Sequence, residues 1–110
     1  MFKITTDPRF THEVKVMVPV DGGHEEQSFK VTFKVVPIDE LKEDVSLSAE
    51  QNQARHLRQV VCGMADLVGD GDAPLDYSDK LRDQLIAIPY VRIAMMRAYL
   101  GAVTKARAGN

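Results

Sequence analysis

The chain has 110 residues, of which 45% are hydrophobic and 27% are charged, and its formal net charge is −2. This length allows one domain with a core but not two, and the balanced composition excludes a disordered tail and a low-complexity segment. The slight acidic excess argues against a protein that binds nucleic acid through phosphate contacts. We therefore expect a single domain over residues 1–110, with a hairpin part at 1–38 and a helical part at 39–110.

The cellular compartment can also be predicted from composition. The single cysteine, Cys62, cannot form an internal disulfide, which indicates a reducing environment. No apolar run approaches the length of a membrane span. The first residues lack the apolar core and cleavage site of a signal peptide. These features predict a soluble intracellular protein.

Two alternating runs come first along the chain. In residues 11–20 valine occupies alternate positions, and in residues 28–36 phenylalanine and valine do the same. Alternation with period two predicts strands that bury one face. An Asp-Gly-Gly sequence at 21–23 favours a tight reversal, so we expect an antiparallel hairpin. Pro19 has no N–H group, which predicts that the first strand lies at an edge.

The helical part is expected to begin with a short turn at 39–42 and a long helix over 49–68. Ser48 and Gln51 have the spacing of a capping box at the start of this helix. Apolar residues then recur at intervals of three and four from Ala54 onward. This spacing predicts a helix with one buried face.

Two further helices are expected over 78–87 and 89–105. Ser78 has the position of an N-cap for the first. Pro89 ends that helix and suits the first turn of the next one. The sequence therefore predicts an α+β fold in which an N-terminal antiparallel β-hairpin is followed by three α-helices.

The residue types that carry catalytic or metal chemistry are present without the spacing that such chemistry needs. His12, His24 and His56 are scattered, and none has a His, Cys or Glu at metal-ligand spacing. No histidine stands near Cys62 at a spacing that would activate its thiol, so a buried small residue is the simpler interpretation. A Cys–His pair formed in space remains an alternative. We predict no catalytic residue, no metal site and no cofactor.

Five aspartates fall between residues 66 and 79 with no Lys or Arg among them. Carboxylates two residues apart around a glycine resemble a calcium-binding loop. Counted from Asp70, however, Leu75 and Leu81 stand where an EF-hand needs Gly and Glu. We interpret this segment as a solvated acidic turn that leads into a helix.

The last predicted helix is apolar around most of its circumference, which is more than one core-facing stripe requires. One set of apolar residues can face the core while a second set remains, and the sequence leaves open which set faces inward. Methionine suits a surface that accepts varied helices. We predict that one stripe binds a second copy or a partner helix; the alternative is that the hairpin covers both. The predicted protein-binding residues are Arg92, Ile93, Met96, Arg97, Leu100 and Val103.

Short sequences along the chain also carry a family resemblance. They lie at 10–16, 18–23, 29–34, 60–63, 73–75, 90–94, 97–100 and 106–110. In order and spacing, and in the Ala-Arg-x-Gly-Asn ending, they resemble the tail assembly chaperones of long-tailed bacteriophages and prophages. One feature departs from that family, whose members often have Gly-Trp after the middle apolar run. Here Gly63 is followed by Met64, and the chain has no Trp.

The resemblance implies a non-enzymatic protein that coats the tape-measure protein before tail tube subunits polymerise around it. It implies the tape-measure protein as partner, the tail tube protein as a further candidate partner, and self-association of many copies. It also implies residence in the cytoplasm of the bacterial host and absence from the mature virion. Many such proteins have a longer frameshifted form, and this chain resembles the shorter product. The alternatives are a small tail structural or completion protein retained in the virion, and a bacterial enzyme or metal-binding protein.

Overall fold

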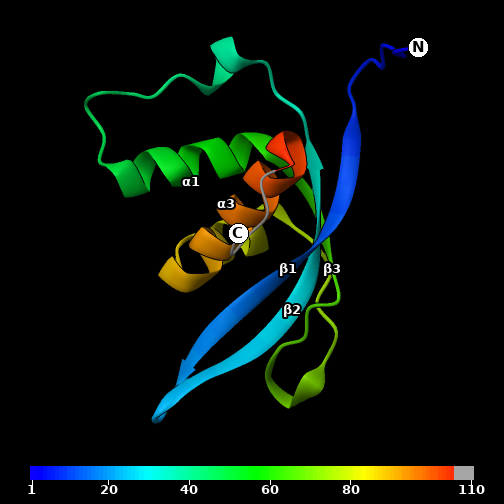
Figure 1. Ribbon diagram of the computed structural model, residues 1–110. Coiled ribbons are helices and arrows are strands. Elements are labelled where there is room, and N and C mark those ends of the chain that lie inside the picture. The colour runs from blue at the N-terminus through cyan, green and yellow to red at the C-terminus, as the bar shows by residue number, and fades with distance from the viewer. Residues whose placement is uncertain (106–110) are drawn as a thin grey trace.

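A long β-hairpin is the first element of the computed structural model, which describes residues 1–105 (Figure 1). Strand β1 (Arg9–Val20) pairs antiparallel with β2 (Gly23–Lys34), and Val14 lies opposite Phe29. Both of these side chains are buried, as is Val16 two residues further along β1. The predicted hairpin and its buried face are therefore confirmed.

The second strand is longer at its start than the predicted 28–36. The hairpin loop consists of Asp21 and Gly22 alone, and Gly22 has a φ of 78°, which glycine adopts without strain. Residues 23–27 therefore continue the ladder, although their polar side chains give no alternation. Val20 and Gly23 are the pair that closes the loop, and hydrogen-bonded and non-hydrogen-bonded pairs alternate along an antiparallel ladder. The backbone nitrogen of Pro19 therefore faces away from β2, where the missing N–H removes no ladder hydrogen bond.

The helix predicted over 49–68 is wrong in its second half. Helix α1 (Ala49–Val60) ends at Val60, and strand β3 (Val61–Ala65) begins at the next residue and pairs antiparallel with β2. The apolar spacing was misleading because it passes through the junction without a break. Leu57 and Val60 are buried on the helix, and Val61 is equally buried on the strand. Consecutive β-branched valines favour the extended chain at this junction. The sheet order is β1-β2-β3, which confirms β1 as an edge strand.

The other predicted helices are confirmed as α2 (Asp79–Ile86) and α3 (Pro89–Thr104). The Ser78 hydroxyl accepts a hydrogen bond from the Leu81 N–H at 3.0 Å, and the capping box of Ser48 and Gln51 is complete at the start of α1. Two short 3-10 turns, Ile38–Leu41 and Asp70–Asp72, lie in the connections. Within residues 1–105 no single helix is long and apolar enough to cross a membrane; only α2 and α3 together pass that test, with a bend of 105° between them.

The three helices cover one side of the sheet, as Figure 1 shows. Between them lie the fully buried side chains of Val31 and Phe33 from β2, Leu57 from α1 and Met95 from α3. The Phe33 ring also lies 5.5 Å from the ring of Tyr99 on α3. The fold is therefore a two-layer α+β arrangement.

The opposite side of the sheet is polar. The Thr11 and Thr32 hydroxyls are hydrogen-bonded across β1 and β2 at 2.8 Å. The Lys30 ammonium lies 3.6 Å from the Asp66 carboxylate, and both side chains are more than half exposed. No second apolar layer is needed on this side.

Replacing Phe33 with alanine tests whether the hairpin face is a closed core. We expect Phe33→Ala to lower the free energy of unfolding by about 3–5 kcal/mol, because it removes a fully buried aromatic side chain and leaves a cavity. Phe2→Ala is the matched control, since Phe2 is 89% exposed, and it should change stability by less than about 0.5 kcal/mol. Chemical denaturation measures both. A loss below about 1 kcal/mol for Phe33→Ala would show that the face is open.

Candidate protein-binding surface

Helix α3 has one buried and one exposed side, which decides the question that the sequence left open. Val91, Met95 and Tyr99 point into the core with Ala94. Burial raises the pKa of the Tyr99 phenol above its usual value. These contacts hold α3 against the hairpin and fix which side of the helix is presented outward.

The predicted binding residues on α3 occupy different environments. Ile93, Leu100 and Val103 are exposed to 44%, 47% and 42%. Met96 is half-buried and packs against the core. The apolar surface that α3 presents outward is therefore made mainly by the first three residues.

The two arginines also differ. Arg92 is half-buried, and its guanidinium donates to the Gln53 side chain at 3.3 Å and to the Ile86 carbonyl at 3.2 Å. It therefore ties α3 to α1 and to the end of α2. Arg97 is exposed and stands beside the apolar stripe.

The stripe continues from α3 onto strand β1. A shallow hollow of about 140 Å³ is shared by Lys15 and Met17 of β1 with Ile93 and Arg97 of α3. Met17 is itself 50% exposed. We call the surface formed by Met17, Ile93, Leu100 and Val103, with Lys15 and Arg97 at its side, the helix face.

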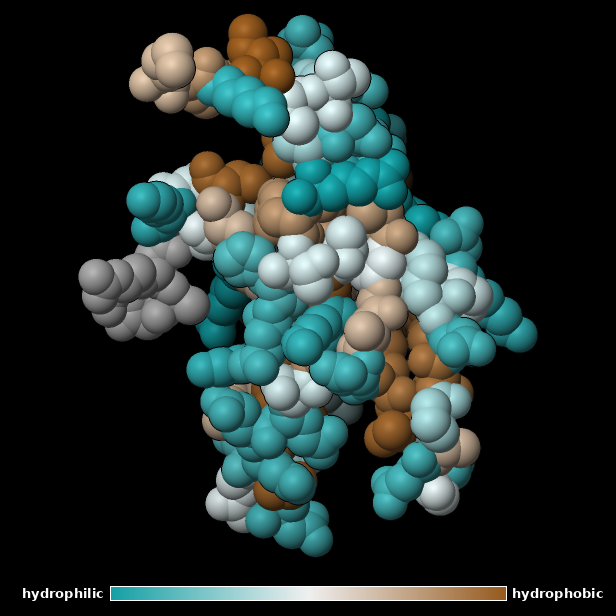
Figure 2. Space-filling model, turned by 90° about the vertical axis from the view of Figure 1, so that its right-hand side faces the viewer, coloured by the Kyte–Doolittle hydropathy of each residue, from teal (hydrophilic) through white to brown (hydrophobic). Residues whose placement is uncertain are grey.

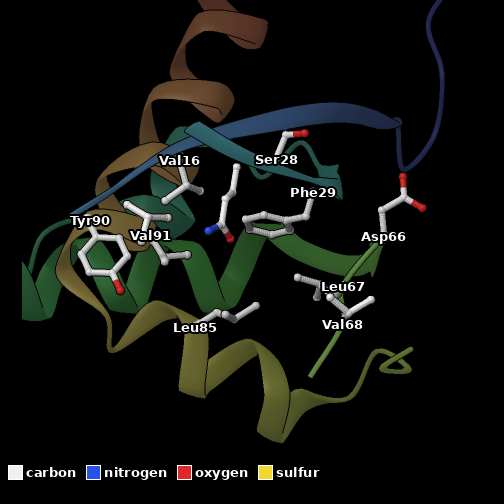
Figure 3. A pocket seen from close by; sticks show the side chains of 11 residues that line it. Val16, Ser28, Phe29, Asp66, Leu67, Val68, Leu85, Tyr90 and Val91 are labelled. Atoms are coloured by element: carbon white, nitrogen blue, oxygen red, sulfur yellow. The ribbon is translucent and has the colours of Figure 1, made fainter. Parts of the chain in front are cut away.

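A second apolar surface lies on the helix side of the outer half of the hairpin. It is an open groove of about 290 Å³, which we call the hairpin groove. In Figure 3 the Val16 and Phe29 side chains extend from the hairpin toward Leu67 and Val68 and toward Leu85 of α2. The groove is lined by Val16, Val18, Gln27, Ser28, Phe29, Asp66, Leu67, Val68, Leu85, Tyr90 and Val91.

Sequence reasoning missed the hairpin groove because it missed β3. A helix through residue 68 would carry Leu67 and Val68 away from the hairpin, whereas β3 pairs with β2 and brings them beside it. Val68 continues the three- and four-residue spacing of Val61 and Met64, so the sequence alone carries no signal against a helix there. In Figure 2 two mainly hydrophilic lobes extend downward with a gap between them, and hydrophobic surface borders this gap.

Of the residues considered for catalysis or metal binding, Asp66 lines the hairpin groove, and Cys62 lies in β3. Cys62 is half-buried in β3, not in a helical stripe, and its thiol lies 3.4 Å from the Thr32 carbonyl. Residues 1–105 contain no group of three or more His, Cys, Asp or Glu side chains that could hold a metal ion. In the acidic loop, Gly71 and Asp72 have φ values of 72° and 59°, which is the geometry of a tight turn.

The chain matches no model of a known protein family, no curated protein and no solved structure. Most of the segments that resemble tail assembly chaperones lie in β1, β2, the α1–β3 junction and α3. The ending at 106–110 lies outside the described residues. Met64, which follows Gly63 in place of the frequent Trp, is half-buried against the core and presents little surface to a partner.

Exchanging acidic side chains in the 70–76 loop tests for a calcium site. Asp70→Asn with Asp72→Asn should leave the free energy of unfolding within about 0.5 kcal/mol, because both residues are exposed and Asn tolerates the positive φ of Asp72. We expect calcium to leave the melting temperature of the unaltered protein unchanged. A calcium-dependent rise that the double variant lacks would establish a site.

Proposed function

We propose that this protein is a tail assembly chaperone of a long-tailed bacteriophage or prophage, and that it binds the tape-measure protein in the host cytoplasm before the tail tube forms. In this proposal it is not an enzyme, and it leaves before the virion is complete. The sequence resemblance supplies the family. The observation that carries the proposal is the helix face, where a small domain leaves Ile93, Leu100 and Val103 open to a partner.

The chemistry of this surface suits an amphipathic helix. Ile93 and Leu100 are seven residues apart, so they lie nearly on one line along α3, and Val103 follows one turn later. A partner helix packed along that line would bury all three side chains by the helix-in-groove mode of recognition. The basic side chains of Lys15 and Arg97 border this line and favour a partner with acidic flanks.

A long tape-measure protein offers many such helices before the tube encloses it. Three half-exposed apolar side chains make a small contact, which gives a weak and reversible interaction. Many copies along one tape measure would then cover its apolar surface together, while each copy can be displaced separately. This combination of coverage and easy release is what a chaperone for tail assembly requires.

Introducing charge on the helix face tests the proposal. Ile93→Glu with Leu100→Glu should leave the protein folded, because both side chains are about half exposed, and should abolish its ability to keep a co-expressed tape-measure protein soluble. Met96→Glu is avoided because Met96 packs against the core. The matched control is Ile38→Glu with Val45→Glu, since these residues are 84% and 99% exposed and lie in the connection between β2 and α1.

Circular dichroism checks folding, and the soluble fraction of the tape-measure protein is the readout. Equal protection by the helix-face variant and the control would contradict the proposal. Mass spectrometry of purified virions separates the proposal from a tail completion protein. The chaperone should be absent from the particle, whereas a completion protein would be retained.

A further inference from the structure

We propose that the hairpin groove of one copy receives the helix face of a second copy, so that the protein associates head to tail. The proposal names an occupant for the groove, in which Val68 and Tyr90 are 58% and 39% exposed. It concerns the free protein: the helix face that the proposed function assigns to a tape-measure helix is occupied here by the groove of another copy, and the two occupants compete for it.

The two surfaces are complementary in polarity and shape. The groove has an apolar floor of Val16, Phe29 and Leu85. Its volume of about 290 Å³ is at the lower end of the usual range for ligand pockets. The helix face is a convex line of apolar side chains, of which Ile93, Leu100 and Val103 project from α3. A helix laid against the groove would remove apolar surface of both copies from water.

Charge distinguishes this pairing from non-specific apolar contact. Residues 16–29 of the hairpin and the segment 66–79, of which only 66–68 line the groove, contain eight Asp and Glu residues and no Lys or Arg. Helix α3 contains no Asp or Glu, and its exposed Arg97 lies with Lys15 of β1 beside the helix face, whereas Arg92 is held against α1 and the end of α2. Helix face against groove therefore places cations beside carboxylates, whereas groove against groove would oppose like charges.

Specific groups stand at the margins of this pairing. Glu25 lies opposite Val18 in the hairpin register, so its side chain is on the groove side of the strands. Asp66 lines the groove and already pairs with Lys30 at 3.6 Å. Asp70 and Asp76 are exposed in the loop beside it, while Arg97 is exposed on the helix face.

One copy cannot satisfy both of its own surfaces. At the start of α3, Val91 lines the groove, and Tyr90 lines both the groove and the hollow that Lys15 and Met17 share with Ile93, so the two surfaces adjoin at Tyr90. Since α3 is held in place by its buried side, it cannot turn into its own groove. Two different patches therefore meet between copies, and such a heterologous contact leaves one free groove and one free helix face at the ends of each assembly.

Two variants test the arrangement. Val68→Glu places a charge in the groove at a side chain that is 58% exposed, and Leu100→Glu does so on the helix face. Each variant alone should self-associate about tenfold or more weakly than the unaltered protein, because a charge enters an apolar contact. Mixed in equal amounts, they should form one-to-one dimers that do not grow, since each variant retains the surface that the other lacks. Val45→Glu, with the same change of charge at a 99% exposed residue, is the control.

Sedimentation velocity over a concentration series measures these outcomes, and circular dichroism verifies folding. If Val68→Glu does not fold, Asp70→Lys with Asp76→Lys replaces it, because both side chains are exposed and only the charge of the groove margin changes. Raising NaCl from about 50 to about 500 mM should weaken self-association of the unaltered protein.

Three results would overturn the inference. A protein that stays monomeric at every concentration has no such contact, whether or not it protects a tape measure. Undiminished association of the groove variant would place the contact elsewhere, for example helix face against helix face. Failure of the two variants to form mixed dimers would exclude the head-to-tail pairing.

Discussion

The structure depends on a mismatch in length between the hairpin and the helices that cover it. Strands of twelve residues extend about 40 Å, whereas the sixteen residues of α3 span about 24 Å. The helices therefore bury only the part of the hairpin nearer its open end, around Phe33 and Val14. The outer part extends below the helices in Figure 1, and there Val18 is half-buried and Val20 is 45% exposed.

Both candidate surfaces follow from this mismatch. The hairpin groove forms where the outer valines of β1 pass beyond α3 and meet the chain that leaves β3. The helix face forms because a single sheet layer can bury one side of α3, and within residues 1–105 no second layer covers the other. A small domain that leaves apolar residues in two places, with opposite charge around them, has the surface that the proposed association requires.

How far the sequence predicted this structure depends on which contacts set each element. The hairpin, α2 and α3 were predictable because their signals are local: alternating valines, a serine N-cap and a proline in the first helical turn. Strand β3 was not, since residues 57–61 suit a helix face and a strand equally, and only pairing with β2 decides between them. The groove forms only when β3 pairs with β2, and the packing of Tyr99 against Phe33 determines which side of α3 faces outward. Both depend on contacts between segments that are distant in sequence, and the spacing of apolar residues along the chain carries no information about such contacts.

The central claim is that the exposed line of α3 is a binding surface, and methyl NMR during titration with a helical tape-measure segment tests it most directly. The methyl signals of Ile93, Leu100 and Val103 are predicted to shift together and to saturate, while those of the buried Val14 and Val31 stay in place. Shifts confined to Leu67 and Val68 in the groove, or no shift at all, would contradict the account.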